Sequence, residues 1–170
     1  LSRGLGDVYK RQASEKGDDV QKIAHLGRTM VKNFVTVGSS LDHCHVPGRS
    51  TDPKERGALS QSAVEIGMGI HNEPGAKHIE NKPSGEDLIK EMLELLLRED
   101  DPERSFVKFN KDDDPVLIIN NLGGMSSIEL GAIAAEARTQ IERDWNLRLS
   151  RVYCGTCLLY TSDAADERSS

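Results

Sequence analysis

One histidine lies in the middle of a stretch rich in glycine and proline. Residues 65–75 read EIGMGIHNEPG, which places glycines before His71 and Pro74-Gly75 after it. Glycines let a backbone or a small molecule approach closely. Glu73 lies two residues further on and projects to the same face of an extended chain. A carboxylate there can take the Nδ1 proton and leave Nε2 with a free lone pair, so the stretch predicts a neutral imidazole that acts as nucleophile or base.

The same residues also fit a histidine that only hydrogen-bonds to nearby backbone at a strand end. A second stretch, DHCHVPG, places His43 and His45 on one face of an extended chain and Cys44 on the other. Two histidines could bind zinc, but a zinc site needs a third or fourth ligand, and the sequence offers none nearby, so we predict no metal site. Three further ligands would serve only if the fold brought them in: His71, His78 and Cys154.

A third stretch, NNLGGMSSIE at residues 120–129, runs from a strand through glycines into the start of a helix. This order is typical of sites that hold anions at a helix N-terminus. It fits neither the dinucleotide fingerprint nor the P-loop, which ends in Lys-Ser/Thr. A tight turn between strand and helix explains it equally well.

The composition of the chain indicates which kinds of binding partner are disfavoured. The chain has 170 residues and a formal net charge of −6, which argues against general binding to nucleic acid or an anionic membrane surface. Cys44 and Cys154 are best interpreted as reduced thiols of a cytoplasmic protein. The sequence contains no apolar run near the ~20 residues that a membrane-spanning helix needs.

The two ends of the chain differ in character from the rest. LSRGLGDVYKRQ at residues 1–12 and CLLYTSDAADERSS at residues 157–170 resemble in-frame translations of sequencing adapters. We therefore exclude both from fold predictions, as one would a fusion scar. The native segment is predicted to be residues 13–156, a part of a longer protein.

Apolar spacing predicts three helices separated by strands. Each helix begins with a side chain able to accept a hydrogen bond from a first-turn amide. In chain order the caps and their partners are Asp18 or Asp19, Ser84 with Asp87, and Ser126 with Glu129. Strands are expected at residues 35–41, 62–71, 106–109, 116–120 and 149–153. The order predicts an α/β fold, a mixed sheet with flanking helices.

Three motifs in register carry a resemblance to a known family. VGSSLDHCHVPG, EIGMGIHNEPG and VLIINNLGGMSSIEL together resemble the dihydroxyacetone kinases. The similarity runs through residues 13–156 and implies the second half of their substrate-binding domain, one subdomain of two. The GIHNEPG form, with Asn72, is similar to the single-chain, ATP-dependent enzymes.

The resemblance implies a particular chemistry. The histidine at the position of His71 bonds covalently to the substrate carbonyl carbon as a hemiaminal, and Glu73 would orient that ring. ATP and Mg²⁺ would serve the parent protein, an expected homodimer, at sites outside this segment, so the segment alone is expected to be inactive. The alternatives are a subunit of a phosphotransferase-linked kinase, a non-catalytic sugar-sensing regulator, and a zinc-dependent hydrolase that uses His43 and His45.

We expect residues 13–156 to be marginally stable by themselves, because a half-domain exposes apolar surface that its other half would cover. Thermal melting followed by circular dichroism should give a broad transition at low temperature. A sharp, cooperative transition well above room temperature would contradict this expectation.

Overall fold

In a computed structural model the chain divides into two compact units, one of residues 37–96 and one of residues 1–36 with 97–170. The structure describes residues 2–40, 62–69, 74–101, 107–110 and 112–156. Helices and strands occur in both units. The predicted α/β class is therefore confirmed.

The unit of residues 37–96 contains a small antiparallel sheet. Its strands are β1 (Ser39–Ser40), β2 (Val64–Ile66) and β3 (Lys77–Ile79), in that spatial order. In the register, Glu65 of the central strand lies between Ser40 and His78. Every residue of β2 is buried, as expected for a central strand whose Val and Ile side chains have high β-propensity.

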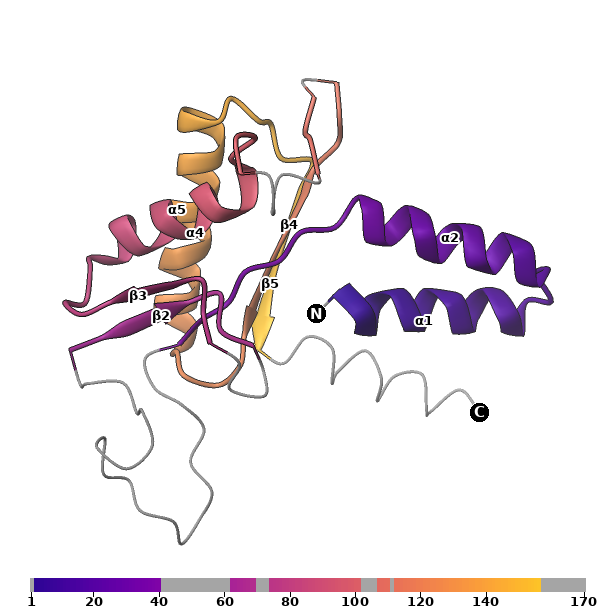
Figure 1. Cartoon of the computed structure of the whole chain (residues 1–170), viewed down its shortest axis with the longest axis horizontal. Coiled ribbons are helices and arrows are strands. Elements are labelled where there is room, and N and C mark those ends of the chain that lie inside the picture. Colours follow the sequence, from indigo (N-terminus) through magenta and orange to yellow (C-terminus); the bar gives the residue numbers. More distant parts are fainter. Residues whose placement is uncertain (1, 41–61, 70–73, 102–106, 111, 157–170) are drawn as a thin grey trace, which may run out of the picture. The chain divides into compact units, whose positions relative to one another are not determined.

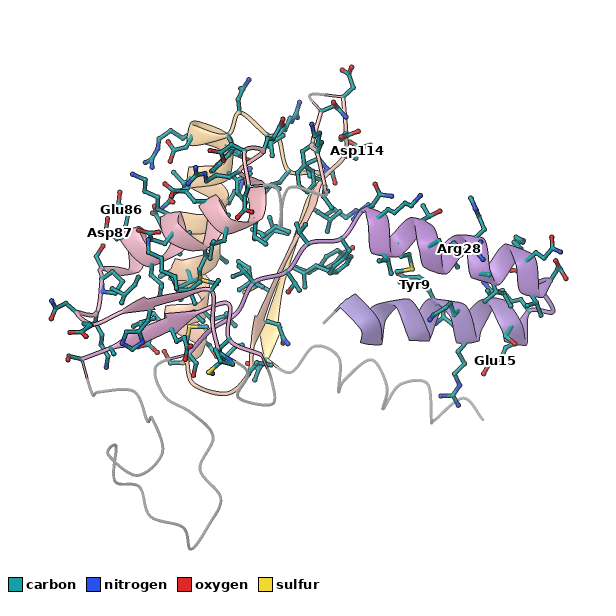
Figure 2. The ribbon with its side chains drawn as sticks, viewed as in Figure 1. Tyr9, Glu15, Arg28, Glu86, Asp87 and Asp114 are labelled. Carbon is teal, nitrogen blue, oxygen red and sulfur yellow. The ribbon has the colours of Figure 1, made fainter. Side chains whose placement is uncertain are left out.

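Helix α4 (Gly85–Leu97) follows the sheet in the same unit. The Ser84 hydroxyl accepts from the Asp87 amide at 3.1 Å, which confirms the predicted cap. Glu86 and Asp87 lie in the first turn, where the helix dipole favours negative charge (Figure 2). Six apolar residues line one side of this helix. Two of them are buried and four are half-buried: Ile89 and Leu93, then Leu88, Met92, Leu96 and Leu97.

A parallel pair of strands with its crossover helix lies in the other unit. Strand β4 (Val116–Asn121) leads into α5 (Ser127–Asp144), and β5 (Arg151–Thr156) returns to pair with β4 along its whole length (Figure 1). The Ser150 amide donates to the Pro115 carbonyl at 2.9 Å and fixes the start of the pairing. This arrangement is the βαβ unit that parallel strands require.

Helices α1 (Ser2–Glu15) and α2 (Val20–Lys32) contact each other side by side (Figure 1). The Asp19 side chain accepts from the Gln21 amide at 3.1 Å, so the predicted cap of α2 is confirmed. Residues 2–12 are helical although we excluded them from fold predictions. Among the described side chains from residue 9 to residue 36, Ala13 alone is buried. The assignment of both ends to adapters stays a prediction.

Some strand predictions were wrong. In the described residues the first strand comprises only Ser39–Ser40, and residues 107–109 form no strand. The second ends at Ile66, because Gly67 adopts a φ of +80°, outside the range of extended backbone. Strand β3 is absent from the predicted strands. It forms because antiparallel pairing with β2 outweighs the weak propensity of Lys-His-Ile.

The sheet prediction also needs refinement. Antiparallel and parallel pairings both occur, as expected for a mixed sheet, but the described strands place them in two separate sheets. The apolar run VLIIN at residues 116–120 suits a strand buried on both faces, yet Val116 is 47% exposed and the next four residues are half-buried. In the described residues β4 has β5 as its one neighbour, so the second flank lacks the cover that a central parallel strand has.

None of the helices in the described ranges combines the length and the apolar character needed to cross a membrane.

The N-terminus of α5 carries the reciprocal capping box that we predicted. The Ser126 hydroxyl accepts from the Glu129 amide at 3.3 Å, and the Glu129 carboxylate accepts from the Ser126 amide at 2.8 Å. The hydrogen bond from the Ser126 amide, then that from its hydroxyl, lowers the pKa of Glu129 from its ordinary value. The box therefore favours the ionised carboxylate.

We predict that α5 loses stability in acid through this group. The contribution of Glu129 is complete above its ordinary pKa of 4.5 and is lost as the pH falls through the lower pKa of the folded state. The melting temperature of the chain should therefore rise with pH over the acidic range up to that value, and it should rise less in Glu129→Gln. Identical slopes in the two proteins would contradict the prediction.

Candidate functional site

The connection between β2 and β3, residues 67–76, contains the predicted site residues. Its described ends are held by backbone hydrogen bonds. The Gly67 amide donates to the Gly38 carbonyl at 2.7 Å, and the Ala76 amide donates to the Ile66 carbonyl at 2.8 Å. The positive φ of Gly67 turns the chain out of β2, and residues other than glycine rarely adopt this backbone conformation. The sheet thus fixes where this segment begins and ends.

A buried carboxylate also holds the end of the connection that precedes β3. Glu65, in the middle of β2, is 9% exposed, and its Oε1 accepts from the Gly75 amide at 2.6 Å. The Glu65 carbonyl accepts from the Ser39 hydroxyl at 3.2 Å on the side of β1. A hydrogen bond to an ionised acceptor is shorter and stronger than one between neutral groups. Glu65 therefore joins its strand to the far end of the segment.

Gly75 has no room for a side chain. A Cβ atom placed on it would lie 2.5 Å from Glu65 Cγ and 2.7 Å from the Ile66 carbonyl oxygen. Both distances are below van der Waals contact, and one of the atoms is backbone. The glycine before β3 is thus required by close approach to the neighbouring strand.

The two residues predicted to do the chemistry, His71 and Glu73, lie outside the described residues, and so does the predicted zinc pair, His43 and His45. These assignments stay predictions. Of the other residues proposed as ligands, His78 is exposed on β3 and Cys154 is an exposed, free thiol on β5. No group of three or more His, Cys, Asp or Glu suited to a metal occurs within the described part of the chain.

The glycine loop after β4 is organised by one side chain. Asn121 is 3% exposed, and its Oδ1 accepts from the amides of Gly123 at 2.9 Å and Met125 at 3.3 Å. Its Nδ2 donates to the Met125 carbonyl at 2.7 Å and to Thr156 Oγ1 at 3.4 Å. An amide side chain has two donors and an acceptor oxygen, and this site uses all of them.

These contacts bear on the anion-binding interpretation of the loop. Asn121 occupies the amides of Gly123 and Met125, and the Glu129 carboxylate occupies that of Ser126. An anion would have to displace the first two contacts and approach a negative charge at the third. The tight-turn interpretation therefore accounts for the loop better.

Sequence reasoning missed both organising residues, Glu65 and Asn121. A signal existed for the first, because Glu65 is the one charged residue within the run AVEIG, otherwise apolar or glycine. A charge at such a position is buried only with a partner. For Asn121 the signal was an asparagine two residues before the glycine pair, where its side chain can bond to backbone two residues on.

Comparison with known proteins identifies the family to which this α/β fold belongs. The family model of the Dak1 domain matches residues 9–164. The chain therefore belongs to the Dak1 domain family. The match extends beyond residues 13 and 156, the predicted limits of the native segment, and those limits remain a prediction.

A relative agrees with the resemblance that the three motifs predicted. The chain is 43% identical over 156 residues to dihydroxyacetone kinase 1 of Saccharomyces cerevisiae, an alignment that covers 91% of this chain and 26% of the relative. The chain thus spans about a quarter of that relative's length. The resemblance to the dihydroxyacetone kinases is confirmed.

Two solved structures share the fold. The dihydroxyacetone kinase from C. freundii, in complex with AMP-PNP and Mg²⁺, has a TM-score of 0.59 and 22% identity over 78% of this chain and 22% of that one. A dihydroxyacetone kinase operon co-activator has a TM-score of 0.63 and 20% identity over 85% of this chain and 41% of that one. A kinase and a regulator therefore share this architecture, which by itself does not decide between them.

We predict that Asn121→Ala destabilises the chain by about 1–3 kcal/mol, because it removes a buried side chain that makes four hydrogen bonds around the loop. Urea denaturation of wild type and variant would measure the change in the free energy of unfolding. Leu122→Ala is the matched control, since Leu122 is the neighbouring residue and is 72% exposed, and it should change stability by less than about 0.5 kcal/mol. Equal effects of the two substitutions would count against the role assigned to Asn121.

Proposed function

We propose that the full-length protein containing this chain is a kinase that phosphorylates dihydroxyacetone to its triose phosphate, with glyceraldehyde as a second substrate. The observation that carries the proposal is the Dak1 domain match over residues 9–164, together with 43% identity to a yeast dihydroxyacetone kinase. Membership of the family supports the substrate class, because the motif that carries the resemblance includes His71.

The proposed role of His71 is to hold the substrate by a covalent bond. One ring nitrogen attacks the carbonyl carbon, a C–N bond forms, and the carbonyl π electrons move to oxygen, which takes up a proton. The other ring nitrogen loses its proton, so the adduct is a neutral hemiaminal with the summed mass of ring and triose. Glycerol has no carbonyl and does not react, which gives selectivity without reliance on shared hydroxyls. The bond also orients the primary hydroxyl for phosphoryl transfer.

Glu73 is proposed to orient His71. Two residues apart on an extended chain, the two side chains share a face. A carboxylate that accepts the Nδ1–H would fix the tautomer in which Nε2 is the nucleophile.

ATP and Mg²⁺ are the proposed donor and cofactor of the full-length protein. The solved kinase with this fold is described with AMP-PNP, an ATP analogue, and Mg²⁺. We propose that the sites for both lie outside this chain; the described residues hold no cluster of three potential metal ligands. Amides at the glycine loop are also engaged by Asn121 and Glu129. We therefore place no step of phosphate binding on these residues, and we propose that the chain alone is inactive.

Intact-mass and peptide mass spectrometry of the full-length protein with dihydroxyacetone tests the proposal. The expected result is an adduct of one triose, without loss of water, on the peptide that carries His71. His71→Ala should abolish the adduct and reduce turnover by several orders of magnitude, because the substrate loses its covalent anchor.

Two outcomes would overturn parts of this proposal. Unchanged adduct and turnover in a folded His71→Ala variant would remove His71 from the mechanism. An adduct without phosphorylation of dihydroxyacetone by ATP would exclude the ATP-dependent kinase and leave a sugar-sensing regulator or a phosphotransferase-linked subunit.

A further inference from the structure

One charged side chain is buried in the described part of the chain, and the proposed chemistry gives it no role. Glu65 is 9% exposed within a central strand whose neighbours Val64 and Ile66 are at most 1% exposed. A carboxylate in such a place carries a large desolvation penalty unless it is hydrogen-bonded. The buried Glu65 carboxylate therefore implies a hydrogen-bond partner that offsets the desolvation penalty.

The sheet itself does not need this carboxylate. Strand pairing uses backbone groups that any residue supplies, such as the Ala76 amide on the Ile66 carbonyl. A β-branched apolar residue would suit a buried central strand better than glutamate. The side chain instead reaches beyond the paired residues to the amide of Gly75, ten positions along the chain.

We propose that Glu65 is a positioning residue for the segment that carries His71. The inference rests on the proposed function. The Glu65–Gly75 hydrogen bond, at 2.6 Å, fixes the end of the segment that follows His71, four residues after that histidine in sequence. The opposite end is fixed at Gly67 by its bond to the Gly38 carbonyl. Because Glu65 is 9% exposed, water competes little for this bond.

Gly75 is the other residue that the Glu65–Gly75 hydrogen bond requires. Because a Cβ atom there would lie 2.5 Å from Glu65 Cγ, only glycine allows the amide to come within hydrogen-bonding distance of the carboxylate. The contact can therefore be broken from either side, by removing the acceptor at residue 65 or by adding a methyl group at residue 75.

The test compares variants of the full-length protein. Glu65→Ala should slow formation of the dihydroxyacetone adduct on His71 by about tenfold to a hundredfold, the range that a small misplacement of reacting groups produces. It should also raise the KM for dihydroxyacetone and leave the KM for ATP unchanged. Glu65→Gln keeps an acceptor oxygen at the same place and should restore most of the rate. Gly75→Ala should reproduce the defect of Glu65→Ala.

The KM values separate positioning from a merely structural role, since loss of folded protein would lower kcat and change neither KM. Glu91→Ala is the matched control: it removes another carboxylate of the same unit, whose partner Lys77 lies on β3, and it should leave adduct formation unchanged. If Glu65→Ala does not fold, Glu65→Asp replaces it in the test. Aspartate keeps the carboxylate but is one methylene shorter, and it is expected to show the same slower adduct formation.

Absence of an adduct in the wild-type protein would reject the proposed function itself. An adduct in wild type that forms at the same rate in folded Glu65→Ala, or in Glu65→Asp where the alanine variant does not fold, would reject the role of Glu65 and leave the function intact. A defect in Glu91→Ala as large as that in Glu65→Ala would also reject the specific role.

Discussion

The contact between the Glu65 carboxylate and the Gly75 amide fixes the described end of the β2–β3 connection that leads into β3. It requires a charge in the centre of a sheet and a glycine at the partner position, and both requirements are met. The loop after β4 is held in the same way by a neutral side chain, because Asn121 accepts hydrogen bonds from the backbone amides of Gly123 and Met125. In each case a buried polar side chain of the preceding strand holds the backbone amide of a glycine that follows it in sequence.

The parts of the fold that could be predicted from sequence are those with local causes. A helix cap depends on residues two or three positions apart, and Asp19, Ser84 and Ser126 all accept from the first-turn amides that their spacing predicts. The β4–α5–β5 unit was predictable for the same reason, because a short apolar run, a capping box and a second strand succeed one another. The family also followed from sequence, through three motifs in register.

What could not be predicted depends on residues distant in sequence. Strand β3 exists because β2 pairs with it, and Lys-His-Ile carries no local signal for a strand. Glu65 was not singled out because its partner is ten positions away, whereas the carboxylate considered for His71 was Glu73, two residues further on. In the candidate site, residue types suggested the reactive group, and the contacts at the base of its segment appeared only in three dimensions.

The capped helix between β4 and β5 has a kinetic consequence. Parallel strands can pair only after a long stretch of chain has closed on itself, and that closure is opposed by entropy. Helix α5 carries its own start signal in the Ser126–Glu129 box and ends near Asn146, whose φ of +53° is the left-handed conformation common after helices. Once α5 has formed within the connection between β4 and β5, mainly residues 122–126 and 145–150 remain to be ordered when the strands pair. The barrier to assembling the parallel pair is correspondingly lower than its separation in sequence suggests.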